Sequence, residues 1–133
     1  MQWEATPNAG FTTGSPWLPL APDAQRVNVA AQRDDPSSMF SFYRRLIQLR
    51  RGSSALRAGS YRTHPAPRGV FAYVREGDGE RVMIALNFLD RPRRISAPGN
   101  GAVVLSTSGE RVEETLRGQF DLAPDEGIVA RLT

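Results

Sequence analysis

The titratable side chains of this chain are too sparse to build most catalytic centres. His64 is the only histidine and there is no cysteine. Two-histidine metal sites, thiol nucleophiles and disulfides are therefore excluded. Because His64 stands beside Pro65 and Pro67, we interpret it as a surface loop residue rather than as a member of a catalytic triad. Asp34 and Asp35 could form a carboxylate pair, but Pro36 and a helical pattern follow them, and acids in that place usually cap a helix. We predict capping at this position and no metal site.

The first twenty residues, MQWEATPNAGFTTGSPWLPL, are the most unusual stretch. They hold Trp3, Phe11 and Trp17 together with three Pro and two Gly, and they show neither helical nor strand periodicity. A long irregular loop has to be held by large apolar side chains. This composition predicts a shaped loop that belongs to a larger structure.

Two different periods follow the loop. From Asp34 to Arg51 the apolar residues keep the i, i+3, i+4 spacing of an amphipathic helix. Asp35-Pro36 or the Ser37 and Ser38 hydroxyls can start this helix, and Gly52 can end it. The VNVAAQ stretch before it, Val27 to Gln32, is too short to assign to helix or strand.

From Gly59 onward the period is two, with Gly, Pro, Asp and Asn between short runs. Strands are predicted at residues 60–63, 70–75, 81–88, 93–96, 102–106, 119–122 and 128–132. The EGDGE stretch predicts a tight hairpin turn. The fold class is therefore mainly β, an antiparallel β-sandwich. Its core candidates, on alternating faces, are Phe71, Tyr73 or its neighbours, Ile84, Leu86, Phe88, Leu105, Phe120, Leu122, Val129 and Leu132.

Charge and hydropathy argue against two classes of partner. The net charge is only +3, and the 17 basic residues, all Arg, are spread along the chain. A nucleic-acid interface clusters such charge with aromatic platforms. No apolar run approaches the roughly 18 residues of a spanning helix, no export signal is visible, and the lack of cysteine suits a reducing cytosol. We predict a cytoplasmic protein that binds neither nucleic acid nor membrane.

Three stretches carry a family resemblance: the opening loop, VNVAAQ, and SFYRRLIQLRRGSSALRAGSY from Ser41 to Tyr61. They resemble the α-glucosidase and oligo-1,6-glucosidase branch of the α-amylase superfamily, glycoside hydrolase family thirteen. FDLAPDEGIVARL is similar to the closing strands of that family's C-terminal β-domain. A complete (β/α)₈ barrel needs about 250 residues. The resemblance therefore implies an incomplete barrel, its last βα loop and helix, over residues 1–58, followed by the C-terminal β-sandwich over residues 59–133.

The resemblance implies hydrolysis of terminal α-glucosidic bonds in short oligosaccharides, with retention of configuration and no cofactor. Retaining hydrolysis needs two carboxyl groups about 5 to 5.5 Å apart. In the family these lie on barrel strands before the matched region, and Glu4, Asp23, Asp34 and Asp35 do not match them. We therefore expect no catalytic residue here, an inactive isolated chain, and the missing catalytic barrel of the same enzyme as its partner.

The same resemblance places the opening loop at the rim where substrates enter the barrel. The substrate-entrance candidates are Met1, Gln2, Trp3, Asn8, Phe11, Thr12 and Trp17. The aromatic rings could stack on an oligosaccharide, but packing of the loop is the favoured interpretation. Without barrel strands beneath it, the apolar face of the helix needs other cover, so we expect a homo-oligomer or a loop folded back on its own chain.

Two alternatives stay open. The chain could be the tail of a trehalose synthase or of a sucrose-acting relative, because their tails share parts of the pattern. From a different class, it could be a free-standing carbohydrate-binding or interaction module. The FTTGSPW sequence favours the glucosidases.

Overall fold

The computed structural model describes every residue from Met1 to Thr133. The chain separates into two compact units, Met1–Arg45 and Leu46–Thr133. Before the strands come a short 3-10 turn and three helices: η1 (Pro7–Gly10), α1 (Val29–Arg33), α2 (Met39–Gly52) and α3 (Ser54–Ala58). None of these helices has the length and apolar character needed to cross a membrane.

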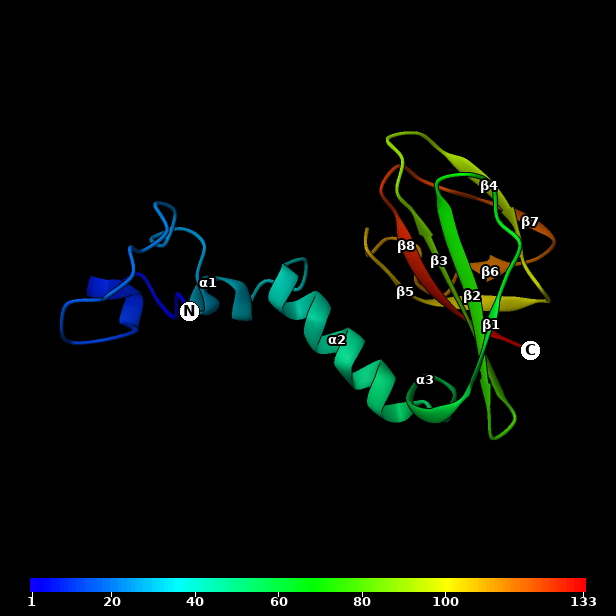
Figure 1. The fold of residues 1–133 in the computed structure, drawn as a ribbon, viewed down its shortest axis with the longest axis horizontal. Helices are drawn as coiled ribbons and strands as arrows, with labels where there is room; N and C mark the ends of the chain where they lie inside the picture. The colour runs from blue at the N-terminus through cyan, green and yellow to red at the C-terminus, as the bar shows by residue number, and fades with distance from the viewer. The chain divides into compact units, whose positions relative to one another are not determined.

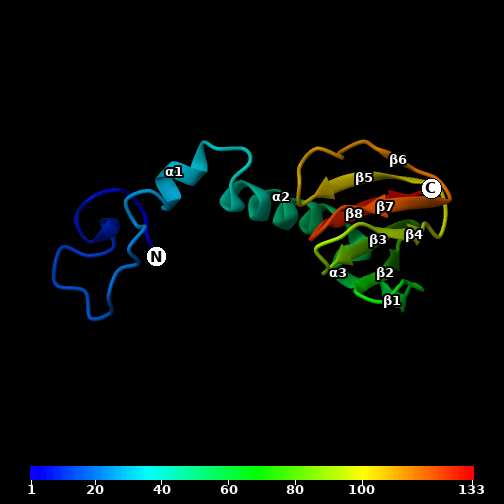
Figure 2. The same cartoon turned by 90° about the horizontal axis from the view of Figure 1, so that it is seen from above.

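The second unit is built on two antiparallel sheets (Figures 1 and 2). The larger has the strand order β1-β2-β3-β8-β5-β6, and β4 pairs with β7 in the smaller. This confirms the predicted mainly-β fold. The strands are β1 (Ser60–Thr63), β2 (Val70–Gly77), β3 (Glu80–Asn87), β4 (Arg93–Ser96), β5 (Gly101–Ser106), β6 (Thr115–Leu116), β7 (Gln119–Leu122) and β8 (Gly127–Leu132).

The main core lies between the two sheets. Met83 on β3, Val103 on β5 and Ile128 on β8 meet Ile95 of β4 and Leu122 of β7, and all five are nearly inaccessible to solvent. Side chains on alternate positions of a strand point to opposite faces, so the other residues of β3 face away from this core. The inward-facing side chains of the strands thus form the core of the sandwich.

A second, smaller cluster lies on the opposite face of the larger sheet. Ala55 of α3 packs with the buried Val82 and Ile84 of β3, and Leu86 and Val129 lie at its edge. Strand β3 is therefore buried on both faces, as its uninterrupted apolar run VMIAL allows.

Part of the core prediction is wrong, because some of the predicted residues lie outside the main core and are exposed. Phe71 and Phe88 are 43% and 66% exposed, so the expectation that they fill the core is wrong. Phe71 pairs with Leu86 on the outer side of the sheet, whereas the small Ala72 and Val74 point inward. Size and hydrophobicity favoured both aromatic positions, but the register places Phe71 on the other face, and Phe88 follows the last residue of β3. The core predictions for Ile84, Leu105, Phe120, Leu122 and Leu132 are confirmed.

Local turn chemistry agrees with the sequence at the first hairpin. Asp78 and Gly79 both have positive φ, 50° and 76°, and Gly77 pairs directly with Glu80 across the turn. This is the geometry that a two-residue hairpin loop requires, and it confirms the prediction for EGDGE.

The amphipathic helix begins later than predicted. Asp34 ends α1, and Asp35 accepts hydrogen bonds from the Ser37 amide and hydroxyl at 2.8 and 2.6 Å, which makes a turn before the helix. The hydroxyl of Ser38 accepts a bond from the amide of Ser41 and caps α2. Gly52 lies inside the helix rather than after it. The alternative in which a serine hydroxyl starts the helix is therefore confirmed for Ser38, whereas neither acid caps α2 and the predicted range is wrong.

Glu80 fixes the start of α3 onto the sheet. One carboxylate oxygen accepts bonds from the Ser53 hydroxyl at 2.6 Å and the Ala55 amide at 3.3 Å. The other oxygen lies 3.3 Å from Arg131 Nε. The hydrogen bond from Ser53 is the main cause that holds the pKa of Glu80 below its usual value, and the hydrogen bond from the Ala55 amide and the charge of Arg131 add to it.

The register makes a prediction about two apolar residues of this hairpin. Phe88→Ala should lower the free energy of unfolding by less than about 1 kcal/mol because the ring is mostly in solvent, whereas Met83→Ala should cost about 2 to 5 kcal/mol. Urea unfolding followed by circular dichroism measures both. A large loss for Phe88→Ala with a small one for Met83→Ala would show that the two faces are exchanged.

The Glu80 contacts predict a pH-dependent contribution to stability. Because its folded pKa is depressed, the carboxylate stabilises the fold above the ordinary value of 4.5, and this contribution is lost as the pH falls through the lower folded pKa. Glu80→Gln should therefore cost about 1.5 kcal/mol at pH 7, and the difference from the parent should shrink in acid. Glu110→Gln, on an exposed side chain, is the matched control and should change little at either pH. An equal loss for both variants would contradict the assignment.

Candidate functional site

The opening loop closes on itself through main-chain hydrogen bonds. The carbonyls of Gln2 and Trp3 accept from the amides of Val29 and Ala30, both at 2.9 Å. The side-chain amide of Gln2 donates to the carbonyl of Val27 at 2.6 Å. Asn28, which is buried, caps α1 by accepting from the Ala31 amide. Both ends of the loop are thus fixed to the same short helix.

A left-handed turn shapes the middle of the loop. Asn8, Ala9 and Gly10 have φ of 56°, 53° and 65°, a region that costs non-glycine residues energy. The Asn8 side chain donates to the carbonyls of Thr12 and Gly14 at 3.1 and 2.8 Å. Ala9 is buried, and its carbonyl accepts from the Trp3 amide. Strained turns held in this way are often found where a surface binds ligand.

The predicted entrance residues line two neighbouring hollows. Met1, Gln2, Phe11 and Trp17 border a cavity of about 320 Å³. Asn8 and Thr12, again with Phe11, border a more open one of about 710 Å³. Phe11 therefore lines both hollows. Trp3 lines neither hollow.

The aromatic rings of the loop are largely in solvent in this chain. Trp3, Phe11 and Trp17 are 48%, 53% and 85% exposed. Exposed rings beside a hollow can contact a ligand or another part of a protein. Their assignment to the substrate entrance stays a prediction.

The acids near this loop do not form a catalytic pair. Glu4 accepts a bond from the Thr6 hydroxyl at 3.0 Å, and the Asp35 carboxylate is occupied by Ser37, whose hydroxyl holds the Asp35 pKa below its usual value. No group of three or more His, Asp or Glu is placed to hold a metal ion. His64 lies in the loop after β1, and its Nε2 is 2.8 Å from the carbonyl oxygen of Ser96. The arrangement can bind or shape a surface but has no paired acid and base.

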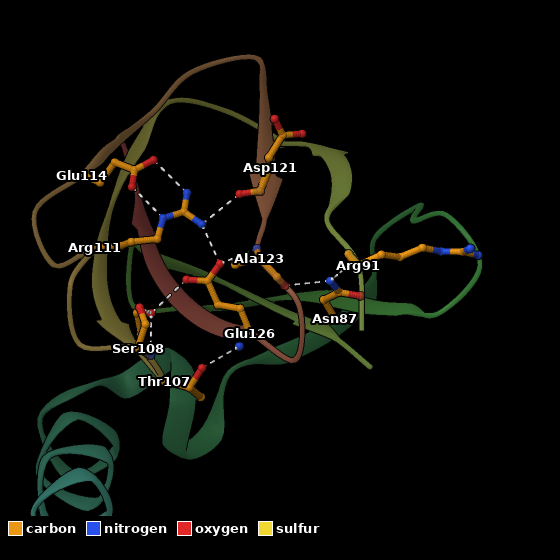
Figure 3. A network of polar contacts seen from close by, with 11 residues as sticks. Asn87, Arg91, Thr107, Ser108, Arg111, Glu114, Asp121, Ala123 and Glu126 are labelled. Carbon is orange, nitrogen blue, oxygen red and sulfur yellow. Dashed lines mark hydrogen bonds and ion pairs between the residues drawn. The ribbon is translucent and has the colours of Figure 1, made fainter. Parts of the chain in front are cut away.

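The best-connected polar residues lie instead at one end of the sandwich (Figure 3). Glu126 is buried, and its carboxylate accepts from the Ser106 hydroxyl at 3.0 Å and from the Ala123 amide and Arg111 Nη1, both at 2.8 Å. Arg111 also makes a two-bond contact with Glu114, which with Glu126 raises the Arg111 pKa above its usual value. Arg111 also donates to the carbonyl of Asp121 at 2.9 Å, so both side chains have several partners within the chain.

This network joins segments that are distant in the sequence. Asn87 extends it at the end of β3, where its amide donates to the carbonyls of Arg91 and Ala123 at 2.9 and 2.7 Å. A buried charge is stable only when it is paired and hydrogen-bonded. We therefore interpret the network as structural: it holds together the loops around β5, β7 and β8. Sequence reasoning missed it. The only available signal was the acid Glu126 just before an apolar strand, and such acids are too common to single out.

Comparison with known proteins gives one consistent answer. The family model for the α-amylase catalytic domain matches residues 1–59. Trehalose-6-phosphate hydrolase of Bacillus subtilis is 36% identical over 100% of this chain and 25% of its own length. The oligo-1,6-glucosidase of Heyndrickxia coagulans is 34% identical over 92% of this chain and 22% of its own length.

Solved structures agree with the sequence comparisons. The trehalulose synthase MutB from Pseudomonas mesoacidophila superposes with a TM-score of 0.87 at 34% identity, over 99% of this chain and 24% of that protein. The chain thus spans about a quarter of the length of the relatives it matches. It belongs to the α-amylase family, glycoside hydrolase family thirteen, and corresponds to the C-terminal part of its members.

Proposed function

We propose that this chain is the C-terminal part of an α-glucosidase-type enzyme that hydrolyses terminal α-glucosidic bonds of short oligosaccharides with retention of configuration. The observation that carries the proposal is the catalytic-domain match over residues 1–59, continued by similarity to hydrolases along the whole chain. The names of several relatives, oligo-1,6-glucosidase among them, support this substrate class. No cofactor is needed for such a reaction, and we place it in the cytoplasm.

In this proposal the chain supplies shape and support rather than chemistry. A retaining mechanism needs a nucleophile and an acid/base group held about 5 to 5.5 Å apart. Among the acids of the first unit, Glu4 and Asp35 form hydrogen bonds in local turns. The two hollows beside Phe11 would border the substrate entrance once the rest of a catalytic barrel is present.

Helix α2 supports the need for such a partner. It has no buried residue, and Met39, Tyr43 and Ile47 are 64%, 56% and 48% exposed. An amphipathic helix normally buries its apolar stripe against other elements. The missing barrel would cover it in the enzyme, and a second copy of the chain would cover it in isolation.

Two other functions have specific support. Similarity to trehalulose synthase, one structure of which holds the substrate sucrose, favours a sucrose-acting relative as the alternative enzyme. The exposed Trp3 and Trp17 favour a carbohydrate-binding module as the alternative from another class. Quenching of Trp fluorescence by maltose or isomaltose that is lost in Trp17→Ala would support the module, and a flat titration would argue against it.

The proposal predicts that activity depends on residues outside this chain. The purified 133-residue chain should match a buffer blank with an aryl α-glucoside, maltose and isomaltose, because it lacks the paired carboxyl groups. A chimaera in which this chain replaces the aligned C-terminal segment of the Heyndrickxia coagulans oligo-1,6-glucosidase should hydrolyse isomaltose. Glucose release measures both.

Two results would contradict the proposal. One is turnover by the isolated chain that survives repurification and is lost when Glu4, Asp23, Asp34 or Asp35 is replaced by its amide. The other is a chimaera that folds but remains as inactive as the host enzyme lacking its C-terminal segment.

A further inference from the structure

Asn100 differs from the other asparagines of the chain. Each of the others donates its side-chain amide to a main-chain carbonyl and is followed by a residue with a side chain; they are Asn8, Asn28 and Asn87. Asn100 is exposed, its hydrogen bonds run through its main-chain carbonyl, and the next residue is Gly101. The side-chain amide of Asn100 is therefore open to reaction.

The fold requires a glycine after Asn100. Gly101 is buried at the start of β5, where it pairs with Leu132 of β8. A Cβ at this position would collide with the carbonyl oxygen of Arg131 and would lie 3.1 Å from Leu132 Cα. A glycine in a strand often marks such a close approach of two backbones. The close contact with β8 thus keeps glycine beside Asn100.

An exposed asparagine before glycine can lose its side-chain amide without an enzyme. The main-chain nitrogen of Gly101 attacks Cγ of Asn100, and the new C–N bond closes a five-membered succinimide ring. The bond from Cγ to Nδ2 breaks, and Nδ2 leaves as ammonia with the proton displaced from the Gly101 nitrogen. Water then opens the ring at either carbonyl, which gives an aspartyl residue or an isoaspartyl residue whose main chain runs through Cβ and Cγ. Glycine favours the attack because it has no Cβ beside the attacking nitrogen.

Strand β6 covers the attacking nitrogen. The Asn100 carbonyl accepts from the Thr133 amide at 2.9 Å, on the β8 side of β5. The C=O and N–H of one trans peptide point in opposite directions, so the Gly101 N–H points toward its other partner, Leu116 of β6. Strand β6 has only two residues and lies at the edge of the sheet, and such elements open more readily than a core strand. The attack requires this edge to open.

We propose that Asn100 is a deamidation site and that the opening of β6 sets the rate of its reaction. The product adds a negative charge to the turn between β4 and β5, and the isoaspartyl form lengthens the main chain by a methylene group. That insertion displaces the Asn100 carbonyl from the Thr133 amide or Gly101 from its contact with Arg131. The reaction therefore weakens the pairing of β5 with β8. This inference does not depend on the proposed function.

Peptide mass spectrometry of the folded chain, after incubation in mildly alkaline buffer, tests the site. Asn100 should lose its amide at least about ten-fold faster than Asn87, the internal control, a difference equivalent to about 1.4 kcal/mol. The tryptic peptide 95–111 contains Asn100 and no aspartate, so any isoaspartyl group in it comes from Asn100. An isoaspartyl methyltransferase with labelled S-adenosylmethionine should methylate that peptide, and Asn100→Gln should abolish the labelling. Equal rates at Asn100 and Asn87 would overturn the assignment.

Two leucine substitutions test the role of β6. Leu116 is fully buried, so Leu116→Ala should loosen β6 and raise the rate at Asn100 about ten-fold. Leu56→Ala is the matched control, because this leucine of α3 packs on the opposite face of the sheet, and it should leave the rate unchanged. Circular dichroism checks that both variants fold, and the milder Leu116→Val, with a smaller rise, replaces Leu116→Ala if that variant does not. An equal rise in both leucine variants would mean that the reaction needs global unfolding, and no rise in either would mean that β6 does not limit it; both results contradict the proposal.

Discussion

The two-sided burial of β3 is the constraint on which the rest of the sandwich depends. Met83 and Ala85 face the smaller sheet, while Val82 and Ile84 face α3. A strand buried on both faces leaves no polar side that could turn to solvent, so its register with β2 and β8 is strongly fixed. The aromatic residues of β2 are placed outward by that register, and a sheet that faces solvent on one side would not normally carry them there.

Polar contacts then fix the loops that the apolar core does not reach. Glu126 and Arg111 join the segments at one end of the sandwich, and Glu80 joins α3 to the first hairpin. Each of these carboxylates is held by more than one donor, which is the condition for burying a charge without a large penalty. Glu126 and Glu80 therefore serve structural contacts in this chain.

Helix α2 leaves its apolar side chains open within this chain, which spans about a quarter of the length of the relatives it matches. The opening loop differs, because hydrogen bonds donated by the side chains of Gln2, Asn8 and Asn28 shape it locally. A loop with its own internal bonds can keep a defined surface, and the two hollows beside Phe11 follow from that.

The sequence alone determined the mainly-β class, most strand positions, the Asp78-Gly79 turn and the family, because period-two alternation, turn residues and a long collinear resemblance are all local signals. It could not determine that α3 and β6 form, since five-residue and two-residue elements carry almost no periodicity. The entrance residues were named from resemblance, and the structure added which of them share a hollow. Tertiary structure decided which face of β2 is the core and which acid is buried, because both depend on contacts between separate elements: β2 pairs with β3 and β3 with β8, and Glu126 contacts Ser106 and Arg111. Phe88 and Glu126 show the limit most clearly. The aromatic ring is exposed and the carboxylate is buried, the reverse of what their chemistry predicts. Only the contacts that the fold brings together could decide this, because burial depends on residues from other elements.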